Sequence, residues 1–324
     1  MNKFRSIEKE IAEVAQGVEF IAVTFSGGKD STALSFALLS AFRNCKNKPK
    51  KVWILYVNTL VDPPPLLQTA QRSLRIFENL GKTIGLPIIP QILTPVLKDR
   101  FWVLLIGKGY PPPSARFRWC SERLKIRPVR NFLRQIEEKY REFPLVLTGI
   151  RLKEGSNRKK NISKRLTKDK WMKYEGLKSC SVYAPLLYLN TNEIWEYIEY
   201  NEKKWGVSMQ HLKQLYSVDS NNVNGFRTGC WVCTLIKRDQ SLEKFAETKP
   251  ELIPLIEFRK FLLEIRDNKE LRDKVEKNGK RYLGPLNMET RKEILKRLEK
   301  IHKLPLEEKK AIYEIWKNYS APLY

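Results

Sequence analysis

The feature that most constrains this chain is a glycine-rich turn between a short apolar run and a helix-like segment. The turn reads SGGKDS, begins at Ser26 and directly follows the apolar run of residues 20–25. A strand that ends in Ser-Gly-Gly and enters a helix near Asp30 presents backbone N–H groups at a helix N-terminus, where the helix dipole favours an anion. Because glycine lets a ligand approach the backbone closely, the turn predicts a phosphate-binding loop.

Apolar runs and helix-like segments alternate through the first half of the sequence. Strands are expected at residues 20–25, 52–57, 86–93 and 145–150, and helices at residues 31–42, 66–80 and 122–136. Such alternation is typical of a parallel sheet with helices on both faces. The sequence therefore predicts the α/β class, with a Rossmann-like parallel sheet flanked by helices.

Three stretches interrupt this alternation, and they differ in composition. Residues 94–119 contain three consecutive prolines, residues 153–178 are dense in lysine and arginine, and residues 217–227 are rich in asparagine and glycine. Long connections of this kind are commonly functional or disordered. From residue 242 onward the pattern is helical. We therefore expect two domains, residues 1–243 and a helical C-terminal extension at residues 244–324.

The charge balance favours an anionic partner. The 324 residues include 61 lysines and arginines against 36 aspartates and glutamates, a net charge of +25. Such an excess attracts polyanions, nucleic acid first, although proteins that bind only nucleotides also carry basic surfaces. The N-terminal residues form an amphipathic helical pattern rather than a secretion signal, and no apolar stretch is as long as a membrane span. We expect a cytoplasmic protein with no membrane partner.

The polar residues of the turn suit phosphate chemistry. Lys29 would add a point charge, and Ser26, Ser31 and Thr32 offer hydroxyls to phosphate or to metal-bound water. Asp30 would cap the helix or hold Mg²⁺ through water. The spacing differs from both the Walker loop and the dinucleotide-binding GxGxxG motif. An ordinary strand-to-helix turn with a capping aspartate is the alternative.

Five cysteines are scattered along the chain, which argues against a disulfide framework and favours metal ligands or core residues. Cys230 and Cys233 form a C-x-x-C pair that can supply two corners of a metal site. Arginines surround Cys120 and favour a thiolate there. Cys180 is either a ligand or a buried thiol, and Cys45 is expected to be a structural thiol. With only two histidines present, the candidates are cysteine-bound zinc and an iron–sulfur cluster.

The turn SGGKDS resembles the PP-loop of the ATP pyrophosphatase superfamily, whose members cleave ATP between the α and β phosphates. Further segments follow in order: NTLVDPPP from Asn58, DRFWVLLIGKGYPPPSARFRWCSERLKIRPV from Asp99, TGIRLKEGSNR from Thr148, VYAP from Val182 and RTGCWVCTLIKRDQSLEKF from Arg227. Together, residues 20–245 resemble the DndC-type sulfurtransferases of DNA phosphorothioation, within the phosphoadenosine phosphosulfate reductase family.

This resemblance implies an adenine nucleotide alpha hydrolase-like (HUP) fold in residues 1–243, together with a cysteine metal site. It implies that the protein uses ATP and Mg²⁺, adenylylates DNA with release of pyrophosphate, and replaces a non-bridging phosphate oxygen by sulfur. The implied cofactor is a [4Fe-4S] cluster, with zinc as the alternative. The implied partners are DNA, a cysteine desulfurase and other proteins of the modification system.

The expected site residues fall into three groups. Those that bind the nucleotide are Ser26, Gly27, Gly28, Lys29, Asp30, Ser31, Thr32 and Arg158. The catalytic residues are Lys29, Asp30 and Arg151, and the metal ligands are Cys120, Cys230 and Cys233, with Cys180 as the fourth. A solvated basic loop is the alternative for the stretch that holds Arg151 and Arg158.

Three other functions stay open. A tRNA thiolation enzyme would share the PP-loop and would equally suit the positive charge. A reductase of adenylyl sulfate or phosphoadenylyl sulfate is the second alternative, although such enzymes usually rely on a cysteine near the C-terminus and none follows Cys233. A nucleotide-sensing, DNA-binding subunit without catalytic activity is the third.

Overall fold

The computed structural model describes residues 2–154, 160, 162–216, 229–277 and 280–319. The chain forms two compact units, and each is built from separate stretches of sequence. The first comprises Met1–Val57, Pro64–Leu93 and Val129–Phe226, and the second comprises Asn58–Pro63, Thr94–Pro128 and Arg227–Tyr324. The expected boundary between residues 243 and 244 lies within helix α9 (Gln240–Thr248) of the second unit, and the division into domains stays a prediction.

A seven-stranded sheet organises the first unit, in the order β3-β2-β1-β4-β7-β6-β5. Its strands are β1 (Phe20–Phe25), β2 (Lys51–Val57), β3 (Ile88–Leu93), β4 (Leu145–Thr148), β5 (Leu166–Lys168), β6 (Trp171–Tyr174) and β7 (Leu177–Tyr183). The first five strands of that order run parallel, and β6 and β5 continue the sheet antiparallel. The expected α/β class is confirmed, as a mostly parallel sheet flanked by helices.

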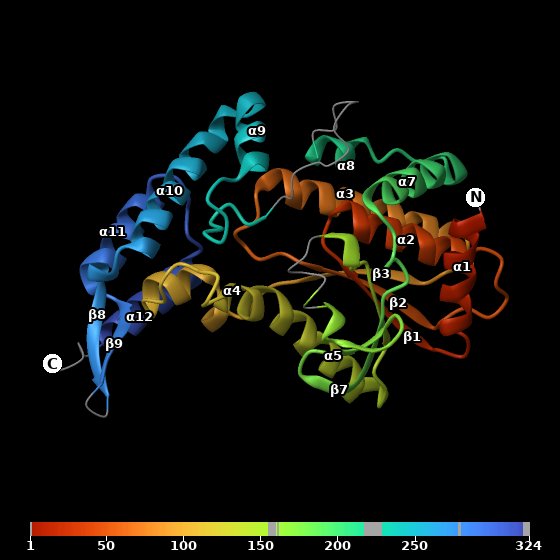
Figure 1. The fold of residues 1–324 in the computed structure, drawn as a ribbon, viewed down its shortest axis with the longest axis horizontal. Coiled ribbons are helices and arrows are strands. Elements are labelled where there is room, and N and C mark those ends of the chain that lie inside the picture. Colours follow the sequence, from red (N-terminus) through yellow and green to blue (C-terminus); the bar gives the residue numbers. More distant parts are fainter. Residues whose placement is uncertain (1, 155–159, 161, 217–228, 278–279, 320–324) are drawn as a thin grey trace. The chain divides into compact units, whose positions relative to one another are not determined.

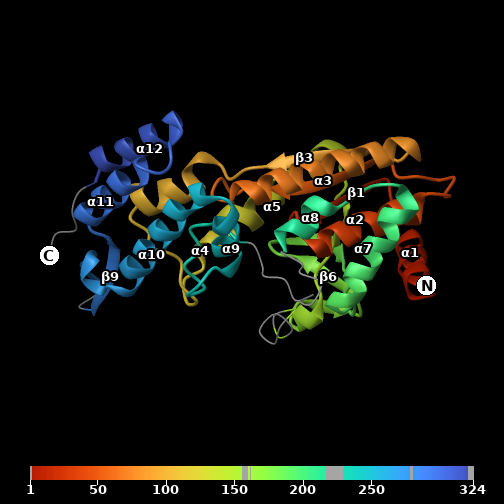
Figure 2. The ribbon, with the colours of Figure 1, turned by 90° about the horizontal axis from the view of Figure 1, so that it is seen from above.

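Helices cover both faces of this sheet (Figures 1 and 2). They are α1 (Asn2–Val14), α2 (Lys29–Phe42), α3 (Pro64–Thr83), α5 (Arg127–Tyr140), α7 (Thr191–Trp205) and α8 (Gln210–Leu215). Successive side chains of a strand point to opposite faces. Phe20 and Ala22 accordingly pack in the core cluster that contains Leu133 of α5, whereas the Phe25 ring meets Phe77 of α3 edge to face, with centroids 5.8 Å apart.

The strand order reverses direction next to β1. From β1 the chain proceeds through β2 to β3 on one side, whereas β4 pairs with β1 on the other side. In open α/β sheets, ligands bind at the carboxyl ends of the strands where the order reverses in this way. The loops after β1 and β4 therefore occupy the position in this unit that is best suited to a ligand.

Three strands of this sheet, β5, β6 and β7, were not expected from the sequence. Strands β5 and β6 lie in the basic stretch of residues 153–178, where a connection without regular structure was expected. Their side chains are mostly exposed or half-buried, since Met172 alone is buried in these two strands. With so few apolar residues, these strands lack the alternation of apolar and polar residues by which a strand is predicted from sequence.

The second unit has its own hydrophobic core, centred on Trp102, Leu105 and Leu262. Its α-helices are α4 (Trp119–Ser121), α9, α10 (Ile253–Asp267), α11 (Met288–Glu299) and α12 (Leu306–Lys317), and π-helical turns occupy Val103–Gly107 and Glu122–Ile126. Short 3-10 turns lie in the two units at Leu97–Asp99, Leu152–Glu154, Pro250–Leu252 and Lys269–Leu271. Among the described residues, none of the helices combines the length and the apolar character needed to span a bilayer.

The C-terminal extension is not wholly helical, contrary to the pattern expected from residue 242 onward. Strands β8 (Arg272–Lys277) and β9 (Lys280–Leu286) form an antiparallel hairpin between α10 and α11 (Figure 1). The sequence RDKVEK of β8 alternates only one apolar residue with charged ones, so hydrophobic periodicity gives almost no signal for a strand.

Candidate functional site

The glycine-rich turn lies where the sequence predicts, between β1 and α2. Gly27 has φ of +75°, a conformation that side-chain-bearing residues rarely adopt, and a Cβ at this position would lie 3.0 Å from the Cβ of Ala70. Gly28 precedes the first helical residue, Lys29, and offers no side-chain cap to the helix. The N-terminus of this 14-residue helix is therefore capped by bare backbone, as an anion-binding loop requires.

Hydrogen bonds within the turn hold it closed. The Ser26 N–H donates to Ser31 Oγ at 3.2 Å, and Ser31 Oγ donates to the Gly28 carbonyl at 2.9 Å. The Ser26 and Ser31 hydroxyls are also 3.2 Å apart. The Thr32 hydroxyl is fully buried and has no hydrogen-bond partner among the described residues. Ser31 thus supports the shape of the loop from inside.

The structure brings together the three residues expected to be catalytic. Arg151, which follows β4, donates from Nε to Asp30 Oδ1 at 2.6 Å and from Nη1 to the Leu189 carbonyl at 3.1 Å. The Lys29 ammonium lies 3.6 Å from Asp30 Oδ2. Arg151 is only 1% exposed, so it is part of the interior beneath the loop rather than of a solvated basic loop.

A glycine at the end of β4 permits this approach. A Cβ on Gly149 would lie 2.9 Å from the Asp30 carbonyl oxygen and 3.2 Å from the Ser31 nitrogen. The backbone after β4 therefore touches the first turn of α2. Arg158, the other arginine expected at this site, lies outside the described residues.

Tyr216 was not expected at this site, yet its side chain lies in the loop. The Lys29 N–H donates to the Tyr216 hydroxyl at 3.0 Å, and the Lys29 ammonium lies 4.9 Å from the centre of the tyrosine ring. Because 187 residues separate the two positions, no local sequence pattern joins them. The first unit thus assembles one site from the loop, the end of β4 and the end of α8.

Three of the four cysteines expected as ligands belong to the second unit. Cys230 and Cys233 lie on a turn closed by a hydrogen bond from the Cys233 N–H to the Cys230 carbonyl at 2.9 Å. Arg259, which is 3% exposed, donates from Nε to the Cys233 carbonyl at 2.8 Å and fixes the far side of this turn. The backbone of the C-x-x-C pair is therefore held by a hydrogen bond within the turn and by the Arg259 side chain.

A second loop packs against Cys230. The Trp231 N–H donates to the Val61 carbonyl at 3.1 Å, which joins the two loops. Cys230 Sγ lies 3.4 Å from Thr59 Oγ1 and 3.5 Å from Asp62 Oδ1. Sequence reasoning missed Thr59 and Asp62, although both belong to the segment NTLVDPPP whose resemblance to the family was noted.

Lys125 is the charged group common to the three thiols of this unit. The Cys230 thiolate raises the pKa of Lys125, with smaller contributions from Asp62, Cys120 and Cys233. Burial raises the pKa of Cys230 to about 12, against the opposing effect of Lys125. We call Cys120, Cys230, Cys233, Asp62 and Lys125 the cysteine cluster.

Burial acts against the thiolate that the sequence favours at Cys120. Burial raises the pKa of Cys120, and the neighbouring Cys233 raises it further, whereas Lys125 and hydrogen bonds from Ser121 only partly oppose the rise. The nearby arginines suggested a thiolate because sequence shows charge but not desolvation, which here is the larger effect.

Cys180 lies in a different environment from the other expected ligands. It is fully buried on β7 of the first unit, in the same apolar cluster as Val146 and Leu187. Burial raises its pKa to about 12. Cys45, expected to be structural, is half-buried and donates from Sγ to the Ala41 carbonyl at 3.1 Å.

The cysteine cluster has the donor chemistry of a site for a thiophilic metal. Three thiols and a carboxylate are the donor types that zinc and iron accept, and a metal would bind the thiols as thiolates. Within the described part of the chain, however, no three His, Cys, Asp or Glu side chains are gathered closely enough to hold an ion as they stand. We therefore assign donors to the metal but no coordination geometry.

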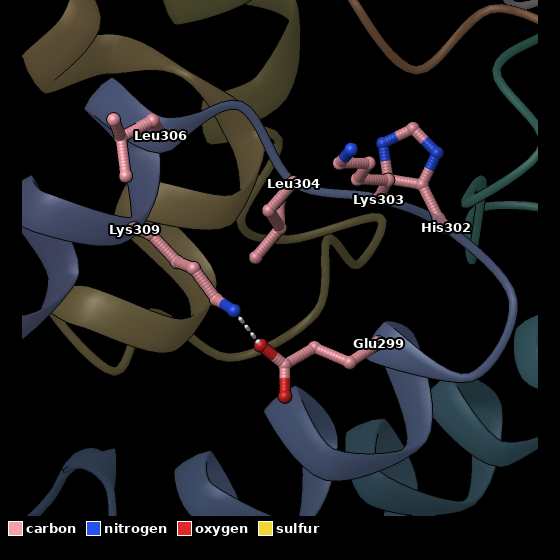
Figure 3. A pocket seen from close by; sticks show the side chains of 6 residues that line it. All are labelled: Glu299, His302, Lys303, Leu304, Leu306 and Lys309. Atoms are coloured by element: carbon pink, nitrogen blue, oxygen red, sulfur yellow. Dashed lines mark ion pairs between the residues drawn. The ribbon is translucent and has the colours of Figure 1, made fainter.

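A surface hollow in the second unit contains none of the expected site residues (Figure 3). Its lining residues are Glu299, His302, Lys303, Leu304, Leu306 and Lys309. Within it, Lys309 and Glu299 form an ion pair of 2.5 Å. The Lys309 and Glu299 charges thus compensate each other, and we assign this hollow no ligand.

Comparison with known proteins gives one family match and one related sequence. Residues 101–235 match the phosphoadenosine phosphosulfate reductase domain, a segment that includes Cys120, Arg151 and the Cys230–Cys233 pair and begins after the glycine-rich loop. The uncharacterized protein MJ0066 of Methanocaldococcus jannaschii is 25% identical over 234 residues, which is 72% of this chain. The match spans only 39% of that protein's length.

Solved structures resemble this chain only distantly. The phosphate complex of phosphoadenylyl-sulfate reductase from Candida auris has a TM-score of 0.39 at 12% identity, over 64% of this chain and 84% of that one. The U34-tRNA thiolase NcsA from Methanococcus maripaludis, solved with its [4Fe-4S] cluster, has a TM-score of 0.39 at 13% identity, over 80% of each chain. Likenesses at this level carry no argument about function.

The family match covers Arg151 and the three thiols of the cysteine cluster, but it covers neither the glycine-rich turn nor Asp62. The comparisons therefore relate residues 101–235 of this chain to the phosphoadenosine phosphosulfate reductase domain.

Proposed function

We propose that this protein is an ATP-dependent sulfurtransferase that adenylylates a nucleic acid, releases pyrophosphate and replaces an oxygen by sulfur. The observation that carries the proposal is the assembly of Lys29, Asp30 and Arg151 around a bare glycine turn at the point of reversed strand order. The substrate proposed is the DNA backbone, with tRNA as the other nucleic acid. A net charge of +25 supports a polyanionic substrate of either kind.

The proposed chemistry begins with activation of a poor leaving group. A phosphodiester oxygen of the nucleic acid attacks the α-phosphate of ATP, and pyrophosphate departs. The AMP-bearing oxygen then becomes a good leaving group, so that sulfide can attack the phosphorus of the backbone and expel AMP. Lys29 and the loop amides would stabilise the negative charge on the departing pyrophosphate, and Mg²⁺, when bound, would add further positive charge there.

Arg151 and Asp30 have supporting roles in this proposal. Arg151 is buried and already paired, so it would orient Asp30 rather than bind phosphate through a free guanidinium. Asp30 presents its carboxylate in the first turn of α2, where it could hold Mg²⁺ through water. Pairing with Arg151 limits the rotation of this carboxylate and keeps it beside Lys29.

The metal is proposed to reside in the cysteine cluster, as a [4Fe-4S] cluster or as zinc. Cys120, Cys230 and Cys233 are the protein ligands, and an iron–sulfur cluster would supply a site that carries sulfide when bound. Cys180 is less suited to be the fourth ligand than the sequence suggested, because apolar side chains of the first unit enclose it. A cysteine desulfurase and other modification proteins are the proposed partners.

Pyrophosphate release tests the proposal directly. The purified protein would be incubated with ATP, Mg²⁺ and duplex DNA, with tRNA in a parallel reaction, and pyrophosphate would be measured over time. Wild-type protein is expected to release pyrophosphate in response to one of the two nucleic acids. Lys29→Ala should lower the rate about 100-fold or more, since it removes a charge that acts on the transition state.

Lys9→Ala is the matched control for Lys29→Ala. Lys9 lies on α1, is 79% exposed in its side chain and pairs only with the neighbouring Glu13, so its loss should not change the rate. Equal rates for Lys29→Ala and Lys9→Ala would show that the glycine turn does not hold the reacting phosphates. Phosphorothioate dinucleotides in nuclease-digested DNA, or thiolated nucleosides in tRNA, would then identify the product by mass spectrometry.

A reductase of adenylyl sulfate or phosphoadenylyl sulfate is the second candidate, and the family match over residues 101–235 favours it. Such an enzyme would release sulfite from its substrate in the presence of a thiol reductant, and it would need no ATP. Sulfite release without pyrophosphate formation would select the reductase. Nucleotide binding with neither product would select the non-catalytic, nucleotide-sensing role.

A further inference from the structure

The Tyr216 hydroxyl occupies the place where the glycine turn offers room for an anion. A Cβ built on Gly28 would lie 2.9 Å from this hydroxyl oxygen. The oxygen therefore lies close to Gly28, on the side where any other residue would carry its side chain. Lys29 is the first residue of α2, and its N–H has no acceptor within the helix. The tyrosine oxygen supplies that acceptor at 3.0 Å.

The backbone N–H and the side-chain ammonium of Lys29 both contact Tyr216. The backbone N–H binds the hydroxyl, and the side-chain ammonium lies 4.9 Å from the ring centre, within the range of a cation–π contact. The same two groups are the donors that the proposed function assigns to pyrophosphate. Another amide of the turn, that of Ser26, donates to Ser31 Oγ.

The position of Tyr216 is fixed by its surroundings. Helix α8, which ends just before it, is joined to α3 by a 2.9 Å hydrogen bond between Ser73 Oγ and His211 Nε2. Thr69 Oγ1 also donates to the His211 carbonyl at 3.3 Å. The Tyr216 ring is 7% exposed and meets the Trp195 ring edge to face, with centroids 5.2 Å apart.

We infer that Tyr216 is a further residue of the nucleotide site, whose hydroxyl competes with a phosphate oxygen for the Lys29 N–H. This inference rests on the proposed function of the loop. A nucleotide that places a phosphate against Gly28 must displace the Tyr216 hydroxyl. The hydrogen bond between this hydroxyl and the Lys29 N–H is then lost, and this loss weakens the net binding of the nucleotide. Tyr216 therefore sets the affinity of the loop for pyrophosphate, in addition to the residues of the turn itself.

Binding of pyrophosphate by isothermal titration calorimetry tests this role. Tyr216→Phe removes the competing oxygen and keeps the ring that packs against Trp195 and Lys29. Its Kd for pyrophosphate should be about 2- to 10-fold lower than that of the wild-type protein, the range expected for one hydrogen bond. Tyr313→Phe is the control, because Tyr313 is 45% exposed on α12 of the second unit, and its Kd should be unchanged.

The outcomes separate this inference from the proposed function. If the wild-type protein binds pyrophosphate and Lys29→Ala does not, the loop is the binding site. A Kd for Tyr216→Phe that equals or exceeds that of the wild-type protein then overturns the role inferred for Tyr216 and leaves the proposed function intact. A lower Kd for Tyr216→Phe without any nucleotide-dependent pyrophosphate release supports the inference and overturns the sulfurtransferase. Failure of all the proteins, Tyr216→Phe included, to bind pyrophosphate overturns both.

Discussion

Arg151 Nε and Asp30 Oδ1 lie 2.6 Å apart, and this ion pair joins the segment after β4 to the first turn of α2. The two residues are 121 positions apart in the sequence. Arg151 has an almost fully buried side chain, whereas that of Asp30 is 22% exposed. Arg151 therefore lies in the interior, whereas Asp30 faces the loop. The ion pair can hold the Asp30 carboxylate in position from its buried side.

Removal of Arg151 should destabilise the first unit. Arg151→Met keeps much of the volume but leaves Asp30 and the Leu189 carbonyl without their donor. We expect the free energy of unfolding to fall by about 1–3 kcal/mol, less than for a fully buried pair because Asp30 is partly exposed. Urea unfolding of the variant and of the wild-type protein measures this change.

A double-mutant cycle distinguishes the pair from simple loss of packing. Asp30→Asn combined with Arg151→Met should be less destabilised than the sum of the two single variants, because each single change leaves one partner unpaired. Additive effects would contradict a coupled pair.

Gly27→Ala should be more harmful than the same change at a glycine of equal conformation. Gly27 and Gly17 both have φ of +75°, but a Cβ on Gly17 meets nothing within 4 Å, whereas one on Gly27 approaches Ala70 at 3.0 Å. We expect Gly17→Ala to cost about 1 kcal/mol of stability and Gly27→Ala about 2–4 kcal/mol.

Thermal and urea unfolding of the two glycine variants give the comparison, and pyrophosphate binding gives a second reading. Gly17→Ala should bind pyrophosphate as the wild-type protein does, whereas Gly27→Ala should not. Equal destabilisation by both substitutions would show that the contact with Ala70 relaxes without cost.

The metal content should depend on the cysteine cluster and not on Cys180. After anaerobic purification, Cys120→Ser, Cys230→Ser and Cys233→Ser should each lose most of the bound iron or zinc. Cys180→Ser should keep it, because this thiol is enclosed by apolar side chains on β7. Elemental analysis, acid-labile sulfide and the visible spectrum measure the metal directly and do not depend on activity.

Cys45→Ser is the second control for the metal measurement, since the Cys45 thiol donates to the Ala41 carbonyl and belongs to neither candidate site. Loss of metal in Cys180→Ser, with the protein still folded by circular dichroism, would restore Cys180 as a ligand. Full metal content in Cys230→Ser would instead remove the cysteine cluster from consideration.

Acidification should weaken the anchoring of α8. Burial, with Arg72 nearby, lowers the pKa of His211 to about 4, although Glu202 partly opposes this. The histidine of the unfolded chain titrates near 6.5, so the folded state favours the neutral ring. The stability that depends on this neutral ring is complete above about pH 6.5 and is lost as the pH falls towards 4, by about 2 kcal/mol at pH 5.

Urea unfolding at pH 7 and pH 5 tests this dependence. His211→Gln cannot titrate, so it should lose less stability between the two pH values than the wild-type protein does. Its loss at pH 7 should be modest, since glutamine can still bond to Ser73, the present partner of His211 Nε2. Identical pH profiles for both proteins would show that His211 is not the titrating group.

Local pattern was sufficient for the central elements of the fold. The four expected strands correspond to β1, β2, β3 and β4, and the three expected helices to α2, α3 and α5, with ends displaced by a few residues. These elements are buried, and burial imposes a hydrophobic period that a sequence displays openly. Strands β5 to β9 were not predicted, because polar and charged residues interrupt their apolar pattern.

The candidate site was predictable only in its contiguous part. The glycine turn could be recognised because its chemistry resides in neighbouring residues of one strand-to-helix junction. The fixing of Arg151 by burial, the hydroxyl of Tyr216 against Lys29, and Asp62 beside Cys230 each join residues more than 100 positions apart. Such contacts leave no periodicity in the sequence.

By itself, the sequence of this protein determined a phosphate-binding turn at the end of a buried strand, an alternating α/β arrangement and a set of candidate thiols. Only the tertiary structure decided which groups share a site and in which charge state, since both depend on distance and desolvation. Cys120 shows the difference most directly: its neighbours in sequence are cationic, but the surroundings created by folding raise the pKa of its thiol.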